Sequence, residues 1–527
     1  MRGSVVTRAA EERSIESSST GEDTGAATIP PRRIVGSGLG MSQQHGDRLS
    51  ATDASFLAQE SPVAHMHVGA MLVFEGPPPA YEDVVDQIRS RLHLVPRYRQ
   101  KLAVPPLETG RPLWVDDTSF NLDYHVRHTA LPKPGSEAQL TALAARIHAQ
   151  RLDRSKPLWE CWIVQGVTAG AEGGRDRFAL IFKTHHALVD GVAGVDLATV
   201  LFDIEPVPSP ATPAIGEPWV PRREPSAVDL AARGLTGLVK TPVKLATRTA
   251  LAATHPTEAL GATRDALEGL GEVAWAALNP APDTPLNVPI GPHRRFVLVR
   301  SELDDFKRVK DAFGCTVNDV VLAAVAGALQ KWLRSRGVRT EGIELRALVP
   351  VSIRTEDQHH TMGNRIAAMR GPLPVYVDDP VVRLRVVKLA MDGLKESKQA
   401  VGAEVLAAAQ NFAPPTVLAQ ASRLNFSTRL FNLLVTNVPG PQFPLYVLGR
   451  RLRDLFPIAF LPTDHALAVA IMSYDGGMDF GLLGDYDAMP DLDRVGDFVK
   501  ESLAELVDAA EGRGAAGRKR AGSPARV

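Results

Sequence analysis

Two adjacent histidines, followed by an aspartate and a glycine, are the residues of this sequence best suited to chemistry. They are His185, His186, Asp190 and Gly191, within the segment KTHHALVDGVAGVDL at 183–197. A histidine has an ordinary pKa of about 6.5, so at neutral pH it can accept the proton of a hydroxyl group that attacks an acyl carbonyl. The imidazolium can then return that proton to a leaving thiolate. The pattern therefore predicts a general base for acyl transfer.

The flanking residues indicate how this motif is positioned. The apolar run Phe178–Lys183 has the length of a strand, and residues 191–201 have the period of a helix. Neighbouring residues of a strand point to opposite faces, so we expect only one of the two histidines to face a cavity. Asp190 is expected to cap the following helix or to pair with an arginine, and Gly191 to permit a tight turn.

A metal site is the main chemical alternative for this motif, and structural histidines are the other. The alternation along the strand opposes binding of one ion by both histidines, and no third ligand follows at a spacing such as HExxH. We therefore expect no metal. Cys161 and Cys315 are far apart and lie in no nucleophile or CxxC motif, so we expect neither a covalent acyl-enzyme nor a disulfide framework.

Composition excludes several classes of protein. A chain of 527 residues predicts two domains, and a formal net charge of −1 argues against a nucleic-acid partner. The N-terminus lacks the apolar segment of a signal peptide, and no apolar run approaches the roughly 18 residues that span a bilayer. We therefore expect a cytoplasmic protein whose membrane contact is peripheral.

Shifts in composition divide the chain into five parts. Met41 is an alternative start, because the residues before it have no apolar period. An amphipathic stretch at 226–278 is either a helical crossover packed on the domains or a lipid-binding helix. The basic C-terminal tail is either a solvated end or a lipid contact. The parts are a disordered extension (1–46), an N-terminal lobe (47–206), a proline-rich and helical linker (207–290), a C-terminal lobe (291–511) and a disordered basic tail (512–527).

Strand and helix signals alternate in both lobes, which predicts two related lobes of mixed α/β structure. Strands are expected at 68–74, 178–183, 295–299, 345–351, 431–437 and 466–473, and helices at 81–94, 191–201, 317–334 and 495–509.

HHxxxDG at the end of a strand resembles the signature of the CoA-dependent acyltransferase superfamily. An ordered set of further segments is similar to the bacterial wax ester synthase/diacylglycerol acyltransferase family. The plant-type DFGWG element is absent, since residues 479–484 read DFGLLG. The segments are LSATDASFL (49–57), PRYRQKL (96–102), PLWE (157–160), VNDVVLA (317–323), VPVSIR (349–354), Gly363 with Asn364, and NVPGP (437–441).

This resemblance implies an α/β fold of the α+β type, with two chloramphenicol-acetyltransferase-like lobes, mixed sheets and a tunnel at their interface. It implies acyl-CoA as a co-substrate, no permanently bound cofactor, and diacylglycerol or a long-chain fatty alcohol as the acceptor. It also implies association with the inner membrane face or with lipid inclusions. The oligomeric state is left open.

The resemblance also assigns roles to single residues. His186 becomes the base, His185 its supporting neighbour and Asp190 the orienting carboxylate. The supporting residues are Gly191, Asn318, Asp319 and Arg354, and the substrate-binding residues are Pro157, Leu158, Trp159, Asn437, Pro439 and Gly440.

Several of these roles have a structural alternative. Trp159 is equally well read as a core aromatic. Asn318 is an oxyanion donor, or caps a helix together with Asp319. The segment 437–441 is a turn or lines the tunnel, and Arg354 pairs with Asp190 or lies on the surface.

Two further functions compete with lipid acyl transfer. One is a condensation-type enzyme that uses carrier-bound acyl groups, which usually has neighbouring modules in the same chain. The other is a non-catalytic scaffold of lipid inclusions, although the presence of both histidines and Asp190 speaks against it.

Overall fold

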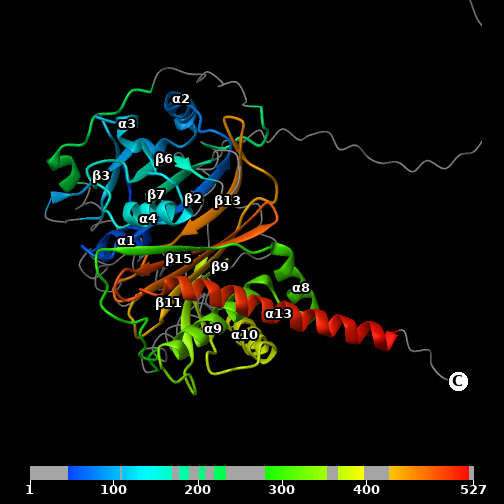
Figure 1. Ribbon diagram of the computed structural model, residues 1–527. Helices are drawn as coiled ribbons and strands as arrows, with labels where there is room; N and C mark the ends of the chain where they lie inside the picture. Colours follow the sequence, from blue (N-terminus) through cyan, green and yellow to red (C-terminus); the bar gives the residue numbers. More distant parts are fainter. Residues whose placement is uncertain are drawn as a thin grey trace, which may run out of the picture. The chain divides into compact units, whose positions relative to one another are not determined.

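Three β-sheets, two of them six-stranded, organise the computed structural model of the protein (Figure 1). Asp190, Gly191 and Arg354 lie outside the residues that the structure describes. The described residues are 46–106, 110–168, 177–188, 201–207, 219–232, 279–352, 366–396 and 426–521.

The first six-stranded sheet holds the strand that ends in the histidine pair. β7 (Arg177–His185) is central and pairs antiparallel with β2 on one side and with β6 on the other. Its residues are buried after the first one, because both faces of the strand are covered, as its unbroken apolar run predicts. The other strands, in sheet order, are β12 (Tyr446–Val447), β13 (Arg450–Ile458), β2 (His67–Glu75), then β6 (Trp159–Val167) and β5 (Val126–Ala130) beyond β7.

The second six-stranded sheet is built from the C-terminal half of the chain. It is mixed, because β11 runs parallel to β9 and β14 whereas the other neighbours are antiparallel. Its strands, in sheet order, are β10 (Ile366–Leu373), β9 (Leu345–Ser352), β11 (Leu433–Pro439), β14 (Leu467–Tyr474), β15 (Gly477–Asp485) and β8 (Arg294–Val299).

A crossover joins the two halves, and the lobe boundaries expected from the sequence did not include it. β12 and β13 belong to the C-terminal half, yet β13 pairs antiparallel with β2 in the first sheet. β13 also contacts β14 and β15 of the second sheet. A Cβ at Gly481 would lie 1.9 Å from the carbonyl oxygen of Pro457, so only glycine permits this approach of β13 to β15. The segment 446–458 is therefore part of the first sheet rather than of a separate C-terminal lobe.

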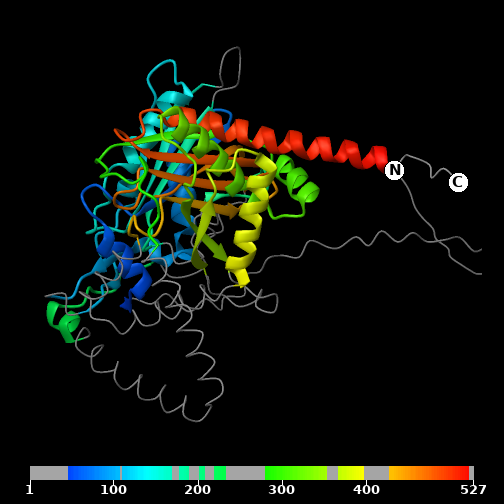
Figure 2. The same cartoon turned by 90° about the horizontal axis from the view of Figure 1, so that it is seen from below.

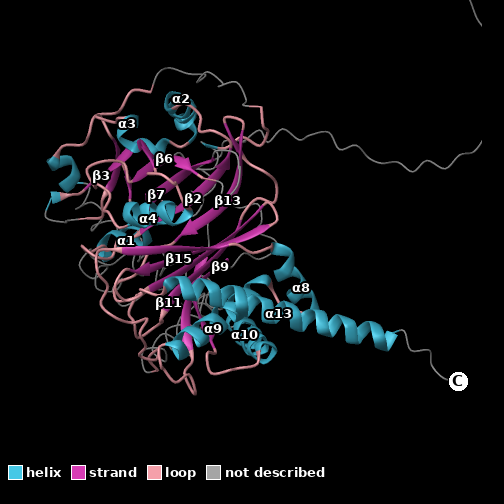
Figure 3. Cartoon of the chain, in the orientation of Figure 1, coloured by secondary structure: helices cyan, strands magenta, loops and turns pink. Residues whose placement is uncertain are grey.

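Helices cover the second sheet, as Figure 3 shows. α9 packs against α13 and α10, and α8 packs against α13 and α9. α9 is buried around most of its circumference, as a core helix must be when it is apolar on nearly every side. These helices are α8 (Leu303–Phe313), α9 (Val317–Ser335), α10 (Pro380–Glu396) and α13 (Leu492–Ala521).

The remaining elements belong to the N-terminal half. A three-stranded sheet has the order β1 (Asp47–Arg48), β4 (Leu113–Asp116) and β3 (Gln100–Ala103). α4 contacts β7 and also β8, so it connects the two halves. The helices are α1 (Ala51–Gln59), α2 (Tyr81–Arg91), α3 (Leu122–His125) and α4 (Glu137–His148), with 3₁₀ turns at Leu92–Leu94 and Pro96–Arg99.

The predicted mixed α/β architecture is confirmed, and the expected strands fall within or overlap observed ones. α2, α9 and α13 correspond to three of the predicted helices, whereas most of the fourth, at 191–201, lies outside the described residues. α13 reaches Ala521, so the prediction of a disordered tail is wrong for residues 512–521. Alanine, arginine and lysine are strong helix formers, which favours continuation of the helix. Figure 2 shows α13 continuing past the sheet.

Among the described helices, none by itself has both the length and the apolar composition of a membrane span. α8 and α9 meet that test only as a pair, and the chain bends by 102° between them.

Candidate active site

The end of β7 presents the histidine pair at a tight turn. His185 is the last residue of the strand and is paired in register with His67 of β2. The amide of His185 donates to the carbonyl of Leu158 at 3.0 Å, and the amide of His186 donates to the carbonyl of Met66 at 2.8 Å. The histidine pair is therefore fixed to both neighbouring strand ends.

His186 lies in aromatic surroundings. Its ring stacks on Phe56 with centroids 3.9 Å apart at an interplanar angle of 21°. Phe460 approaches edge-on, with centroids 5.7 Å apart. Nδ1 is buried and has no hydrogen-bond partner among the described residues, although the residue as a whole is only half-buried. The exposed part of the residue therefore lies elsewhere than at Nδ1.

Burial sets the charge of His186. It lowers the pKa of His186 to about 4, and contact with the residue's own backbone acts weakly in the opposite direction. This value is well below the 6.5 of a free imidazole, so the ring is neutral at physiological pH. The neutral form is the one that can accept a proton.

His185 has a different environment and a structural role. Its Nδ1 accepts a hydrogen bond from the amide of Ala187 at 3.0 Å, which stabilises the turn. Burial lowers the pKa of His185 to about 3, although the nearby Glu60 acts to raise it. The two adjacent rings therefore enter different surroundings, and His186 is the one with an accessible part.

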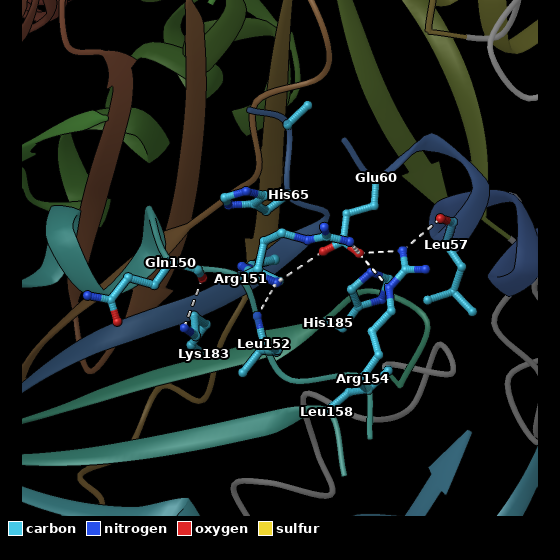
Figure 4. A network of polar contacts seen from close by, with 12 residues as sticks. Leu57, Glu60, His65, Gln150, Arg151, Leu152, Arg154, Leu158, Lys183 and His185 are labelled. Carbon is cyan, nitrogen blue, oxygen red and sulfur yellow. Dashed lines mark hydrogen bonds and ion pairs between the residues drawn. The ribbon is translucent and has the colours of Figure 1, made fainter. Parts of the chain in front are cut away.

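Glu60 is the centre of a polar network beside His185 (Figure 4). Its side chain is only 1% exposed. Oε2 accepts from Arg151 at 3.0 Å and from Nε of Arg154 at 2.7 Å. Arg154 also donates to the carbonyl of Leu57 at 2.9 Å. The network therefore attaches the end of α1 to the segment that follows α4.

The electrostatics of this network favour an ionised Glu60. Burial acts to raise the pKa of Glu60, but the hydrogen bond from Arg151 and the charge of Arg154 outweigh it, so the pKa lies below its ordinary value. His67 lies 3.6 Å from Glu60, but burial holds the pKa of His67 well below its usual range. The contact between Glu60 and His67 is therefore not an ion pair at neutral pH.

Lys183 of β7 connects this strand to the end of α4 by buried polar contacts (Figure 4). Its ammonium donates to the carbonyls of Ile147 and Gln150 at 3.0 and 3.1 Å and lies 3.3 Å from Glu160. A cation at the carboxyl end of a helix stabilises the unpaired carbonyls there.

The PLWE segment (157–160), which leads into the neighbouring strand β6, supports the end of β7. The carbonyl of Leu158 accepts from both Thr184 and His185. Trp159 is buried, donates to the carbonyl of Tyr98 at 2.8 Å and stacks on His125. This packing favours the core-aromatic alternative for Trp159. An acyl-handling role for Pro157, Leu158 and Trp159 stays a prediction.

Asp319 caps a helix. Thr316 and Asp319 form a capping box at the start of α9, with the amide of Thr316 donating to Asp319 at 2.8 Å. None of the described hydrogen bonds, ion pairs or ring contacts joins Asn318 or Asp319 to either histidine. The oxyanion role of Asn318 stays a prediction.

The segment 437–441 contains the end of β11 and the two residues that follow it. Asn437 and Pro439 pair in register with Ile471 and Ser473 of β14. A Cβ at Gly440 would lie 2.2 Å from the carbonyl oxygen of Ser473, so this position requires glycine. Residues 437–439 are therefore strand rather than turn, and a tunnel-lining role for the segment 437–441 stays a prediction.

The sequence interpretation missed the aromatic neighbours of His186 and the Glu60 network. Phe56 lies in LSATDASFL, and Arg151 and Arg154 lie just before PLWE, so their proximity to family segments was an available signal. Phe460 lies in no such segment, and only the fold brings it to His186. Asp190, Gly191 and Arg354 lie outside the described residues. The described part of the chain contains no group of three or more His, Cys, Asp or Glu suited to holding a metal ion.

Solved structures place this architecture in a known class. A starter condensation domain of rhizomide synthetase, solved in complex with C8-CoA and Leu-SNAC, has a TM-score of 0.52 at 13% identity, over 89% of this chain and 95% of that one. At this identity the similarity concerns the fold alone. The chain therefore shares the fold of that condensation domain.

Closer relatives define the family. Residues 49–321 match the wax ester synthase/diacylglycerol acyltransferase catalytic domain, and residues 362–507 match the WS/DGAT C-terminal domain. A Mycobacterium tuberculosis protein named as a diacylglycerol O-acyltransferase is 34% identical over 90% of this chain and 94% of its own length. The wax ester synthase/diacylglycerol acyltransferase of Marinobacter aquaeolei VT8 has a TM-score of 0.61 at 28% identity, over 88% of this chain and 100% of that one. The chain belongs to the wax ester synthase/diacylglycerol acyltransferase family, and it is an O-acyltransferase.

A third match, to the GGDEF domain of diguanylate cyclases, spans residues 284–386. It overlaps both matches above, and the stretch contains no Gly-Gly pair, so the motif that names that domain is missing. It carries no functional conclusion.

Proposed function

We propose that this protein transfers a long-chain acyl group from acyl-CoA to the hydroxyl group of diacylglycerol or of a long-chain fatty alcohol, with His186 as the general base. The observation that carries the proposal is a neutral imidazole, on a half-buried residue at the end of β7, packed between phenylalanines from both halves of the chain. The names of the relatives supply the two candidate acceptors.

The reaction is a direct transfer. His186 accepts the hydroxyl proton while the acceptor oxygen attacks the thioester carbonyl, which gives a tetrahedral intermediate. The carbon–sulfur bond then breaks, and the imidazolium donates its proton to the departing thiolate. The products are an ester and free CoA, and His186 is neutral again.

The cysteines support a mechanism without an acyl-enzyme. Burial raises the pKa of Cys161 and also raises the pKa of Cys315 to about 11, so neither thiol is ionised at neutral pH. A thiol that stays protonated is a poor nucleophile.

The apolar character of the contact between the two halves supports a long-chain substrate. One cluster of buried apolar residues includes Met71 of β2, Leu143 of α4, Phe296 of β8 and Phe456 of β13. Phe56 and Phe426 pack against this cluster. We place the acyl chain along this contact, so that the two substrates meet at His186 in a passage between the lobes.

The direct test is CoA release by the purified protein with palmitoyl-CoA, offering hexadecanol and dipalmitoylglycerol separately in mixed micelles. We expect release that requires an acceptor, with formation of the corresponding ester. If well-folded protein released no CoA with either acceptor but accepted acyl groups from a carrier protein, a condensation-type function would replace this one.

We also propose that the protein works at a lipid surface. Ile204, Val207 and Phe443 are 68%, 72% and 50% exposed. They flank the bridge between Asp203 and Tyr446, which brings their two segments together. Exposed apolar side chains grouped in this way suit insertion among lipid headgroups.

The lipid-surface proposal has its own measurement. The double variant Ile204→Asp/Phe443→Asp is expected to sediment less with phosphatidylglycerol vesicles than the wild type, with an unchanged midpoint of thermal unfolding. Equal sedimentation of the two proteins would count against this surface.

A further inference from the structure

Two phenylalanines contact the imidazole of His186, and a third packs against both of them. Phe56 stacks on its face, and Phe460 meets it edge-on. Phe426 contacts both of these rings, with centroids 6.3 and 5.9 Å away. Phe56 comes from α1, whereas the other two come from the C-terminal half, so the base is enclosed only when both halves are in place.

Within the part of the chain that the structure describes, the orientation of His186 has few other supports. Among the described residues its Nδ1 has no hydrogen-bond partner, and the ring is not held by a carboxylate there. A ring without such a bond can rotate about its side-chain torsions unless packing prevents it. The stack with Phe56 restricts that rotation, because a parallel contact at 3.9 Å is lost when the imidazole turns out of plane.

α1 is itself anchored, so Phe56 has a fixed position. Ser50 caps the start of α1 by accepting from the amide of Asp53 at 3.0 Å. At the other end, Arg154 binds both the carbonyl of Leu57 and the carboxylate of Glu60 (Figure 4). Phe56 lies between these two anchors, one residue before the carbonyl that Arg154 holds.

We propose that Phe56 is a positioning residue for the base, which holds the imidazole of His186 in the orientation required for proton transfer. This inference rests on the proposed function of His186. The contact is through the ring face, so it neither donates nor accepts the transferred proton. Phe56 instead increases the fraction of time that the imidazole spends in its reactive orientation. A displacement of a catalytic group by about 1 Å can lower the rate about a hundredfold.

The same packing limits the access of water to the base. Among the described residues, the groups that face His186 are the aromatic rings and the neighbouring His185, which burial keeps neutral. Glu60, Arg151 and Arg154 act on His185 and lie in the adjacent network. Removing the Phe56 ring therefore lets water reach the imidazole without changing a charge beside it. The protonated form of His186 then becomes less unfavourable, so the pKa of His186 must rise towards the ordinary value of histidine.

The test compares Phe56→Leu, Phe56→Ala and Phe56→Tyr with Phe74→Leu as a matched control. Phe74 is a buried residue of β2 whose ring stacks on Phe178 with centroids 4.9 Å apart. Phe74→Leu therefore reports the effect of losing a buried aromatic pair as such. At pH 8, where His186 is neutral in every variant, we expect Phe56→Leu to lower kcat about ten- to a hundredfold. KM for palmitoyl-CoA should change less than about threefold, and Phe56→Tyr should restore kcat because it restores the stack.

Two outcomes would overturn the proposal. One is wild-type kcat in Phe56→Leu. The other is an equal loss of kcat in Phe56→Leu and Phe74→Leu that follows their midpoints of thermal unfolding, which would make Phe56 an ordinary packing residue.

A second readout does not depend on activity. In protein with isotope-labelled histidines, the titration midpoint of His186 should move from about 4 in the wild type towards 6.5 in Phe56→Ala. An unchanged midpoint would contradict the enclosure of the base by Phe56. Because this midpoint is measurable in an inactive protein, failure of the proposed function and failure of this inference are distinguishable.

Discussion

His186→Ala is expected to lower kcat for acyl transfer between about a hundred- and ten-thousandfold while the protein stays folded. The imidazole is the neutral, partly accessible proton acceptor of the described site, so without it the hydroxyl oxygen must attack while still protonated. The measurement is acceptor-dependent CoA release, together with the midpoint of thermal unfolding. A small shift of that midpoint is expected, because the stack with Phe56 is lost.

Two other histidines provide controls. His128 is exposed on β5, so His128→Ala should retain wild-type kcat. His185→Asn keeps an acceptor for the amide of Ala187, since asparagine forms the same bond to the residue two positions on. It should therefore lose less activity than His186→Ala. If His186→Ala were catalytically inert but still supported lipid inclusions in cells, a scaffold function would be favoured.

Asp479→Asn is expected to change the free energy of unfolding, relative to the wild type, in a way that depends on pH. The change should favour the variant by about 2 to 4 kcal/mol more at pH 8 than at pH 4. Burial, and next the charge of Asp454, raise the pKa of Asp479 from 3.8 to about 7. In the unfolded chain this carboxyl ionises near pH 4, but in the folded protein it keeps its proton until about pH 7. Its contribution to stability is therefore complete below pH 4, and falls as the pH rises through this window. Asparagine does not titrate, so the variant avoids that loss.

The measurement is the midpoint of thermal unfolding between pH 4 and 8, followed by tryptophan fluorescence. The matched control is Asp475→Asn at the nearby β14–β15 turn. Asp475 has a positive φ of 44°, which asparagine tolerates, and pairs with Arg451 at the surface. Destabilisation by Asp479→Asn to the same extent at both ends of the pH range would show instead that the carboxylate is stabilised by Arg300, which bonds to the neighbouring Asp454.

The sequence by itself identified the candidate base and determined the class of fold and the family. These depend on local patterns: a buried strand followed by two histidines, and short segments in a fixed order. The period of the apolar residues located the strands that became β2, β7 and β14, and the long helix α9, because a buried face imposes its own spacing. The capping alternative for Asp319 was also readable, since Thr316 and Asp319 have the spacing of a capping box.

Only the tertiary structure decided what surrounds that base. Phe460 follows β13, whose entry into the first sheet depends on pairing with β2 and on the glycine contact with β15. The Glu60 network joins residues about 90 positions apart. Such contacts leave no period in the sequence, because they depend on which strand edges and helix ends meet in space. The chemistry of His186 is therefore encoded locally, whereas its orientation and its lowered pKa follow from packing between distant segments.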